Sequence, residues 1–81
     1  MSNMVIVLVL DKNGRPASNI DVAASVGGFP SGMTDDFRTD ESGRAMVTWS
    51  SSATYLEHLY VNGCRHEGPH RPEGGPVVIY L

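Results

Sequence analysis

The fold is decided by residues 4–14, which read Met4-Val5-Ile6-Val7-Leu8-Val9-Leu10-Asp11-Lys12-Asn13-Gly14. The run of apolar, largely β-branched residues over 4–10 predicts a strand. The Asn13-Gly14 pair predicts a tight turn, because both residue types tolerate positive φ. The chain therefore opens as one arm of a hairpin.

Five further segments show strand signals, and Gly, Pro, Asn or Asp residues separate them. They are residues 20–26, 33–39, 45–49, 55–62 and 77–81. No window long enough for a helix has a 3.6-residue apolar period. Residues 63–76 contain four Gly and three Pro, which predicts a long loop. The pattern predicts an all-β fold, an antiparallel sandwich of six to seven short strands.

Composition limits the classes of function. The chain has 81 residues, 41% apolar and 19% charged, with a formal net charge of −3, which predicts a single domain over 1–81. An acidic balance argues against nucleic acid as a partner. The longest apolar run is far shorter than the ~20 residues of a membrane span. No basic segment precedes that run, so we expect no signal peptide, which favours the cytoplasm.

Three segments resemble carboxypeptidase regulatory-like domains. Residues 7–22 resemble the opening of that family, a strand followed by D-x-x-G-x-P and a hydrophobic-x-V strand. Residues 39–45, T-D-E-S-G-R-A, resemble its T-D-x-x-G-x-hydrophobic signature, and residues 59–63 are similar to the strand that follows. The resemblance implies a transthyretin-like (prealbumin-like), Ig-like Greek-key sandwich related to Cna-B and starch-binding-like domains. It implies an accessory role and no active site.

The motif residues have structural explanations. Gly14 and Gly43 are expected to supply positive φ in hairpin turns. Asp11 and Asp40 are expected to accept hydrogen bonds from turn N–H groups through their carboxylates.

The first strand is apolar on both faces, one with Val5, Val7 and Val9 and the other formed by the even-numbered residues. Strands of small sandwiches usually have one wet face. Either loops cover the second face, or Val5, Val7 and Val9 form a subunit interface. The leading expectation is a non-catalytic binding or assembly module. It would contact a protein partner or a second copy through the first strand and the 63–76 loop.

A metal site is the first alternative. Cys64, His66 and His70 fall within one loop, with His58 as a fourth candidate on the preceding strand. A thiolate and imidazoles suit Zn²⁺ or Cu²⁺, although the spacing matches no standard zinc module. The alternative is a solvated loop with incidental His residues and no cofactor. Cys64 beside a His also suggests a nucleophile and base, but a Gly/Pro loop offers no dry pocket, so we expect no enzyme.

Carbohydrate binding is the second alternative. Four aromatic residues are candidates for a sugar-stacking platform. They are Trp49, Tyr55, Tyr60 and Tyr80. Trp49 shares its strand face with Val47, which instead predicts a core position for the indole.

Overall fold

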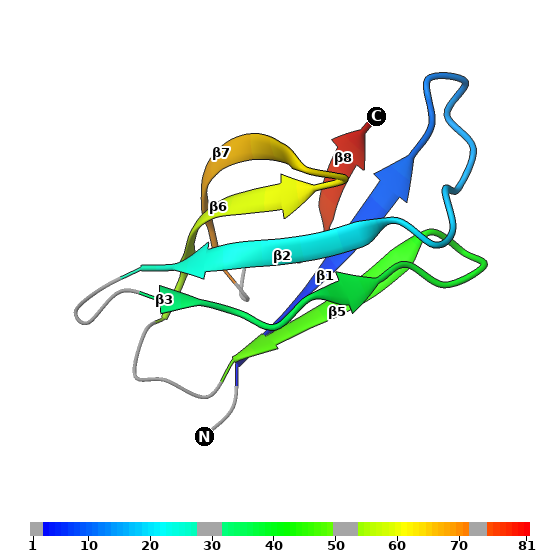
Figure 1. The fold of residues 1–81 in the computed structure, drawn as a ribbon. Coiled ribbons are helices and arrows are strands. Elements are labelled where there is room, and N and C mark those ends of the chain that lie inside the picture. Colours follow the sequence, from blue (N-terminus) through cyan, green and yellow to red (C-terminus); the bar gives the residue numbers. More distant parts are fainter. Residues whose placement is uncertain (1–2, 28–31, 50–53, 72–74) are drawn as a thin grey trace.

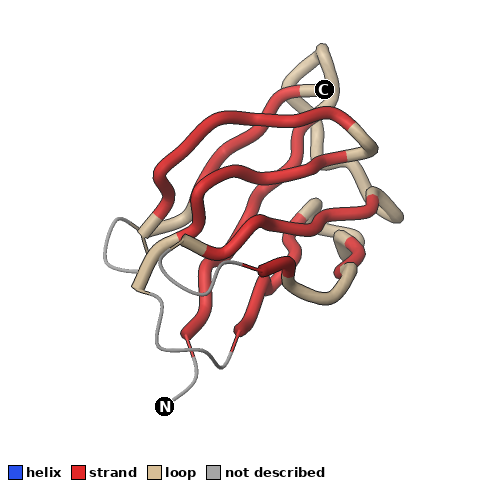
Figure 2. Tube along the Cα trace, turned by 60° about the vertical axis from the view of Figure 1, so that its left-hand side comes forward, coloured by secondary structure: helices blue, strands red, loops and turns tan. Residues whose placement is uncertain are grey.

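The computed structural model describes residues 3–27, 32–49, 54–71 and 75–81. Within these ranges the chain contains strands and no helix, so the all-β prediction is confirmed (Figure 2). The strands are β1 (Asn3–Leu10), β2 (Asp21–Val26), β3 (Gly32–Met33), β4 (Phe37–Arg38), β5 (Arg44–Trp49), β6 (Leu56–Val61), β7 (Cys64–His70) and β8 (Val77–Tyr80).

The strands form two sheets (Figure 1). One has the order β5-β1-β8, and the other has the order β3-β2-β6-β7 with β4 also paired to β2. Val7 of β1 lies beside Ala45 of antiparallel β5 and beside Val77 of parallel β8. The expectation of a wholly antiparallel fold is therefore wrong at β8. The chain enters β8 from β7 in the other sheet, and such a crossover permits a parallel pair.

The hydrophobic core lies between the sheets. Val5, Val7 and Val9 point into it and are at most 1% exposed. The rest of the core comes from both sheets, namely Val22, Ala24, Val26, Ala45, Val47, Trp49, Leu56, Leu59, Val61 and Ile79. Trp49 is a core residue, as its strand face predicted. The expected subunit contact through Val5, Val7 and Val9 is corrected, because these side chains are already covered within the chain.

Two turns of the same sequence pattern, D-x-x-G-R, connect strands on the β5-β1 side. In the first, a carboxylate oxygen of Asp11 accepts from the N–H groups of Asn13 and Arg15 at 2.8 and 3.0 Å. In the second, Asp40 accepts from Ser42 and Arg44 at 2.9 and 3.1 Å. The predicted role of both aspartates is confirmed.

The glycines of these turns also adopt the predicted backbone. Gly14 has φ 82° and Gly43 has φ 78°. A Cβ on Gly43 would stand 2.7 Å from the carbonyl oxygen of Val9, whereas a Cβ on Gly14 would meet nothing within 4 Å. Gly43 is therefore required by close packing as well as by its φ.

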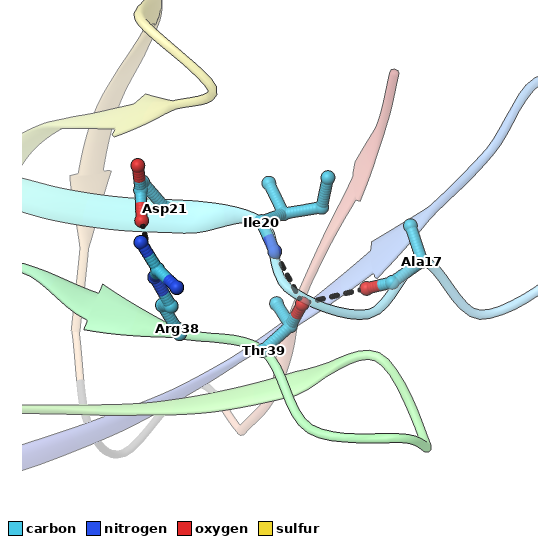
Figure 3. A network of polar contacts seen from close by, with 5 residues as sticks. All are labelled: Ala17, Ile20, Asp21, Arg38 and Thr39. Carbon is cyan, nitrogen blue, oxygen red and sulfur yellow. Dashed lines mark hydrogen bonds and ion pairs between the residues drawn. The ribbon is translucent and has the colours of Figure 1, made fainter.

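Thr39 joins the connection before β2 to the end of β4 (Figure 3). Its hydroxyl donates to the carbonyl of Ala17 at 2.6 Å and accepts from the N–H of Ile20 at 3.0 Å. Beside it, Arg38 Nε contacts a carboxylate oxygen of Asp21 at 3.0 Å, with both side chains largely exposed. Thr39 thus satisfies two backbone groups in a buried position.

Two predicted segments differ from the structure. Residues 33–39 were expected as one edge strand, but they contain only the end of β3 and all of β4, each two residues long. Residues 63–76 were expected as a loop, but Cys64–His70 forms β7 and pairs with β6. Pro is compatible with an edge strand, because its missing N–H can face away from the ladder. Gly68 and Pro69 lie where the β6–β7 register shifts.

Candidate functional site

The outer face of the β5-β1-β8 sheet is apolar. Ile6 lies beside Met46, and Leu10 lies beside Tyr80. The most exposed side chains are those of the flanking strands: Met46 is 58% exposed and Tyr80 is 62% exposed. The outward-facing residues of the three strands, all within the described ranges, are Met4, Ile6, Leu8, Leu10, Arg44, Met46, Thr48, Val78 and Tyr80. Arg44 is the one charged member.

We call these outward-facing residues the outer apolar face. A sheet in a two-layer fold normally presents a polar side to water. Four apolar side chains of this outer face are well exposed, Met4 at 44%, Met46 at 58%, Val78 at 45% and Tyr80 at 62%, which is unusual for a sheet face open to water. The face of the first strand that stays partly exposed is therefore the one formed by its even-numbered residues, opposite Val5, Val7 and Val9.

A hollow indents the outer apolar face beside the start of β8. Met4, Ile6, Gly75 and Pro76 line it, and its volume is about 110 Å³. Pockets that enclose a small molecule usually exceed ~300 Å³. The hollow is therefore smaller than a typical small-molecule pocket.

The candidate metal ligands lie on the β6–β7 hairpin, where Cys64, His66 and His70 are opposite core residues of β6 and only His58 faces the other side of the sheet. His58 is opposite Glu67, and His66 is opposite Leu59. Leu59 is a core residue, so His66 lies on the inner side of the sheet and His58 on the outer side. Cys64 is exposed and free. In the described part of the chain, no three His, Cys, Asp or Glu side chains come together as a metal-binding group.

His58 belongs instead to an exposed polar cluster. Its Nδ1 lies 3.7 Å from Glu67 Oε2, and Glu67 Oε1 lies 2.9 Å from Arg65 Nε. The rings of His58 and Tyr60 meet edge to face with centroids 5.8 Å apart. These contacts are between partly or largely exposed groups, which contribute little to stability.

His70 occupies a more confined position. Its Nε2 is buried and has no hydrogen-bond partner among the residues that the structure describes. Burial lowers the pKa of His70, because the charged imidazolium is less well solvated there. A hydrogen bond with the backbone of Glu67 opposes this shift, and the nearby charge of His66 adds to the lowering.

The four aromatic residues do not form one platform. Trp49 is buried in the core, and Tyr80 is on the outer apolar face. Tyr60 is on β6 in the other sheet. The ring of Tyr55 is covered by the guanidinium of Arg71, 5.4 Å from its centroid.

The sequence did not point to Met46 or Val78, and it suggested Tyr80 only as a candidate for sugar stacking. The signal for Val78 and Tyr80 was present in the last strand, where both alternating sets of side chains are apolar. Such a strand, like the first one, exposes apolar surface if only one of its faces is covered.

No protein-family model, curated protein or solved structure matches this chain. Within the described ranges, no helix has the length and apolar character needed to cross a membrane.

Proposed function

We propose that the chain is a non-catalytic assembly module that makes protein contacts through the outer apolar face. The observation that carries the proposal is the exposure of a nearly uncharged sheet face in an acidic protein. Met46 and Tyr80 are more than half exposed on it. Contiguous apolar surface of this extent marks interaction sites in soluble proteins.

We further propose a carboxypeptidase regulatory-like domain with a transthyretin-like, Ig-like Greek-key topology. Support comes from the motif residues, since both D-x-x-G-R turns use their aspartate and glycine as that signature implies. The strand orders β5-β1-β8 and β3-β2-β6-β7 are compatible with this topology. The family role of an accessory domain agrees with a contact surface in place of a catalytic pocket.

The test is the concentration dependence of the mass in solution, measured by light scattering. Met46 and Met33 are matched, at 58% and 59% exposed, but only Met46 is on the outer apolar face. We expect reversible association of the unmodified protein. Met46→Lys is expected to weaken it at least tenfold, because a desolvated lysine opposes burial, and Met33→Lys to leave it unchanged. A monomer at every concentration, or equal effects of the two variants, overturns the proposal.

A further inference from the structure

The sheet edges differ in how they are protected against pairing with another chain. Charges, Pro and very short strands discourage edge-to-edge association. In the five-stranded sheet, β3 and β4 are two residues long, and β7 contains Arg65, Glu67 and Pro69. On the other sheet, β5 begins with Arg44, whose carbonyl accepts from the N–H of Asp40 at 2.9 Å. Of the edge strands in the described part of the chain, only β8, Val-Val-Ile-Tyr, is longer than two residues and has neither a charge nor a Pro.

The free groups on the β8 edge can be identified from its pairing. The N–H of Leu81 donates to the carbonyl of Leu10 at 2.8 Å, and Leu10 is in register with Tyr80. In a parallel ladder the backbone groups of alternate residues face the partner strand, so residues 77, 79 and 81 face β1. The N–H and C=O groups of Val78 and Tyr80 therefore point away from β1. Among the described residues, β8 pairs with β1 alone.

We propose that a second copy of the chain adds to this edge, β8 against β8, antiparallel and about a two-fold axis. The inference goes beyond the function proposed above, because the contact is the β8 edge, and the outer apolar face stays exposed across the dimer. In this dimer, Val78 of each copy lies opposite Tyr80 of the other. In that register the free N–H and C=O groups of both residues are all hydrogen-bonded across the edge. The product is one continuous sheet of order β5-β1-β8-β8-β1-β5, and the outer apolar face runs across it.

The side chains in this register are self-complementary. On the outer face, Val78 packs against Tyr80 of the second copy, a β-branched residue beside an aromatic ring. On the inner face, Ile79 meets Ile79 at the two-fold axis. The hollow beside Pro76 lies on the same face as Val78, next to where the ring of Tyr80 from the second copy lies. No like charges oppose each other, since Arg44 lies on β5, with β1 between it and β8.

The chemistry of the edge favours a second copy over a charged peptide. The strand offers no ionic group to a charged partner. A second β8 strand, in contrast, places apolar side chains opposite its own on both faces of the sheet. Val78 is 45% exposed, Tyr80 is 62% exposed and Leu81 is 47% exposed. A contact between two strands of four residues is smaller than a standard interface, so the dimer is expected to be weak and reversible.

The first experiment needs no variant. Amide hydrogen exchange is followed by NMR at a dilute and a concentrated sample, and the Val78 and Tyr80 amides are compared with those of Met46 and Thr48. We expect the Val78 and Tyr80 amides to slow at least tenfold on concentration, because they become hydrogen-bonded only in the dimer. Unchanged exchange of both amides in a sample that light scattering shows to be associated overturns edge pairing.

The second experiment tests the register. Val78→Lys is expected to weaken dimerisation at least tenfold, since two lysines are desolvated near the two-fold axis. The double variant Val78→Lys/Tyr80→Glu is expected to restore it to within about threefold, because each lysine then faces a glutamate. Met33→Lys is the control, and thermal unfolding of each variant checks that it is folded.

The outcomes separate this inference from the proposed function. Weaker dimerisation of Val78→Lys, together with its recovery in the double variant, supports β8 pairing. If Met46→Lys dissociates the assembly and Val78→Lys does not, the assembly function stands and β8 pairing is overturned. If the unmodified protein is monomeric throughout, both are overturned.

Discussion

Thr39 links the sequence signature to a physical requirement. It is 3% exposed, and its hydroxyl donates to the carbonyl of Ala17 and accepts from the N–H of Ile20, both in the connection between β1 and β2. A threonine that begins a T-D-x-x-G motif is thereby explained, because its hydroxyl supplies a partner to each of two backbone groups beside a buried side chain. The sequence predicted the turn that follows Thr39, but the hydroxyl's partners depend on how β2 and β4 pair.

Replacing Thr39 by Val keeps the shape and removes both hydrogen bonds. We expect the free energy of unfolding to fall by about 1–3 kcal/mol, because the Ala17 carbonyl and the Ile20 N–H lose partners without gaining water. Urea unfolding at low protein concentration measures this. Thr48→Val, on the exposed side of β5, is the control, and an equal change in both variants contradicts the explanation.

His70 predicts a pH effect of defined sign. Its pKa in the folded chain is lowered from the usual 6.5 by burial, so the folded state prefers the neutral imidazole. The contribution of the neutral His70 to the free energy of unfolding is fully present above pH 6.5. It is lost as the pH falls from 6.5 toward the lowered pKa of the folded state. Asp40 does not interfere in this range, since its pKa is lowered from 3.8, first by the Ser42 hydroxyl and then by the Arg44 N–H.

The measurement compares urea unfolding of the unmodified protein and of His70→Gln from about pH 7.5 to 5.5. We expect the unmodified protein to lose stability across this window more steeply than the variant does. Parallel pH profiles for the two proteins would show that His70 does not cause the effect.

Among the elements, the two D-x-x-G-R turns provide a matched pair. Gly14 and Gly43 have nearly the same φ, but only Gly43 faces a backbone oxygen at 2.7 Å. Gly14→Ala is expected to cost about 1–2 kcal/mol of stability, the strain of an L residue at positive φ. Gly43→Ala is expected to cost more, because the Val9 carbonyl must also move. Thermal unfolding of both variants measures the difference, and equal losses contradict it.

Strands with clear alternation or β-branched runs were predictable, and β7 was not. Its Gly and Pro content is that of a loop, and its pairing with β6 depends on the Asn62-Gly63 turn and on tertiary contacts that local sequence does not show. The same ladder explains why the metal candidates fail to gather. A strand alternates its side chains between two faces, so His58 is on the opposite side of the sheet from Cys64 and His66, whereas a loop was free to bring the three together.

For the molecule as a whole, the sequence showed that the first strand has two apolar faces, but not which of them packs against the second sheet. Both alternating sets are apolar, and the choice depends on the side from which the second sheet packs. Compact valines occupy the dense core, while methionine, isoleucine and leucine remain on the outer apolar face. The β8 edge beside that face is also apolar, which determines how the proposed dimer should respond to salt.

Association through an apolar edge should respond little to ionic strength. Raising the salt from about 50 to 500 mM is expected to change the dimer dissociation constant less than threefold, and toward tighter binding, because each copy carries a net charge of −3. Sedimentation equilibrium measures this. A tenfold weakening in high salt would instead indicate an interface made by ion pairs.

The pairing of β1 with β8 also governs how the chain reaches this fold. Val7 lies beside Val77, so nearly the whole described chain separates two neighbouring strands. During synthesis, β1 and β5 can form their ladder long before residues 77–80 have been made. Until then the even-numbered amides and carbonyls of β1 remain open beside an apolar surface, and a nascent chain stalled at this stage is exposed to aggregation.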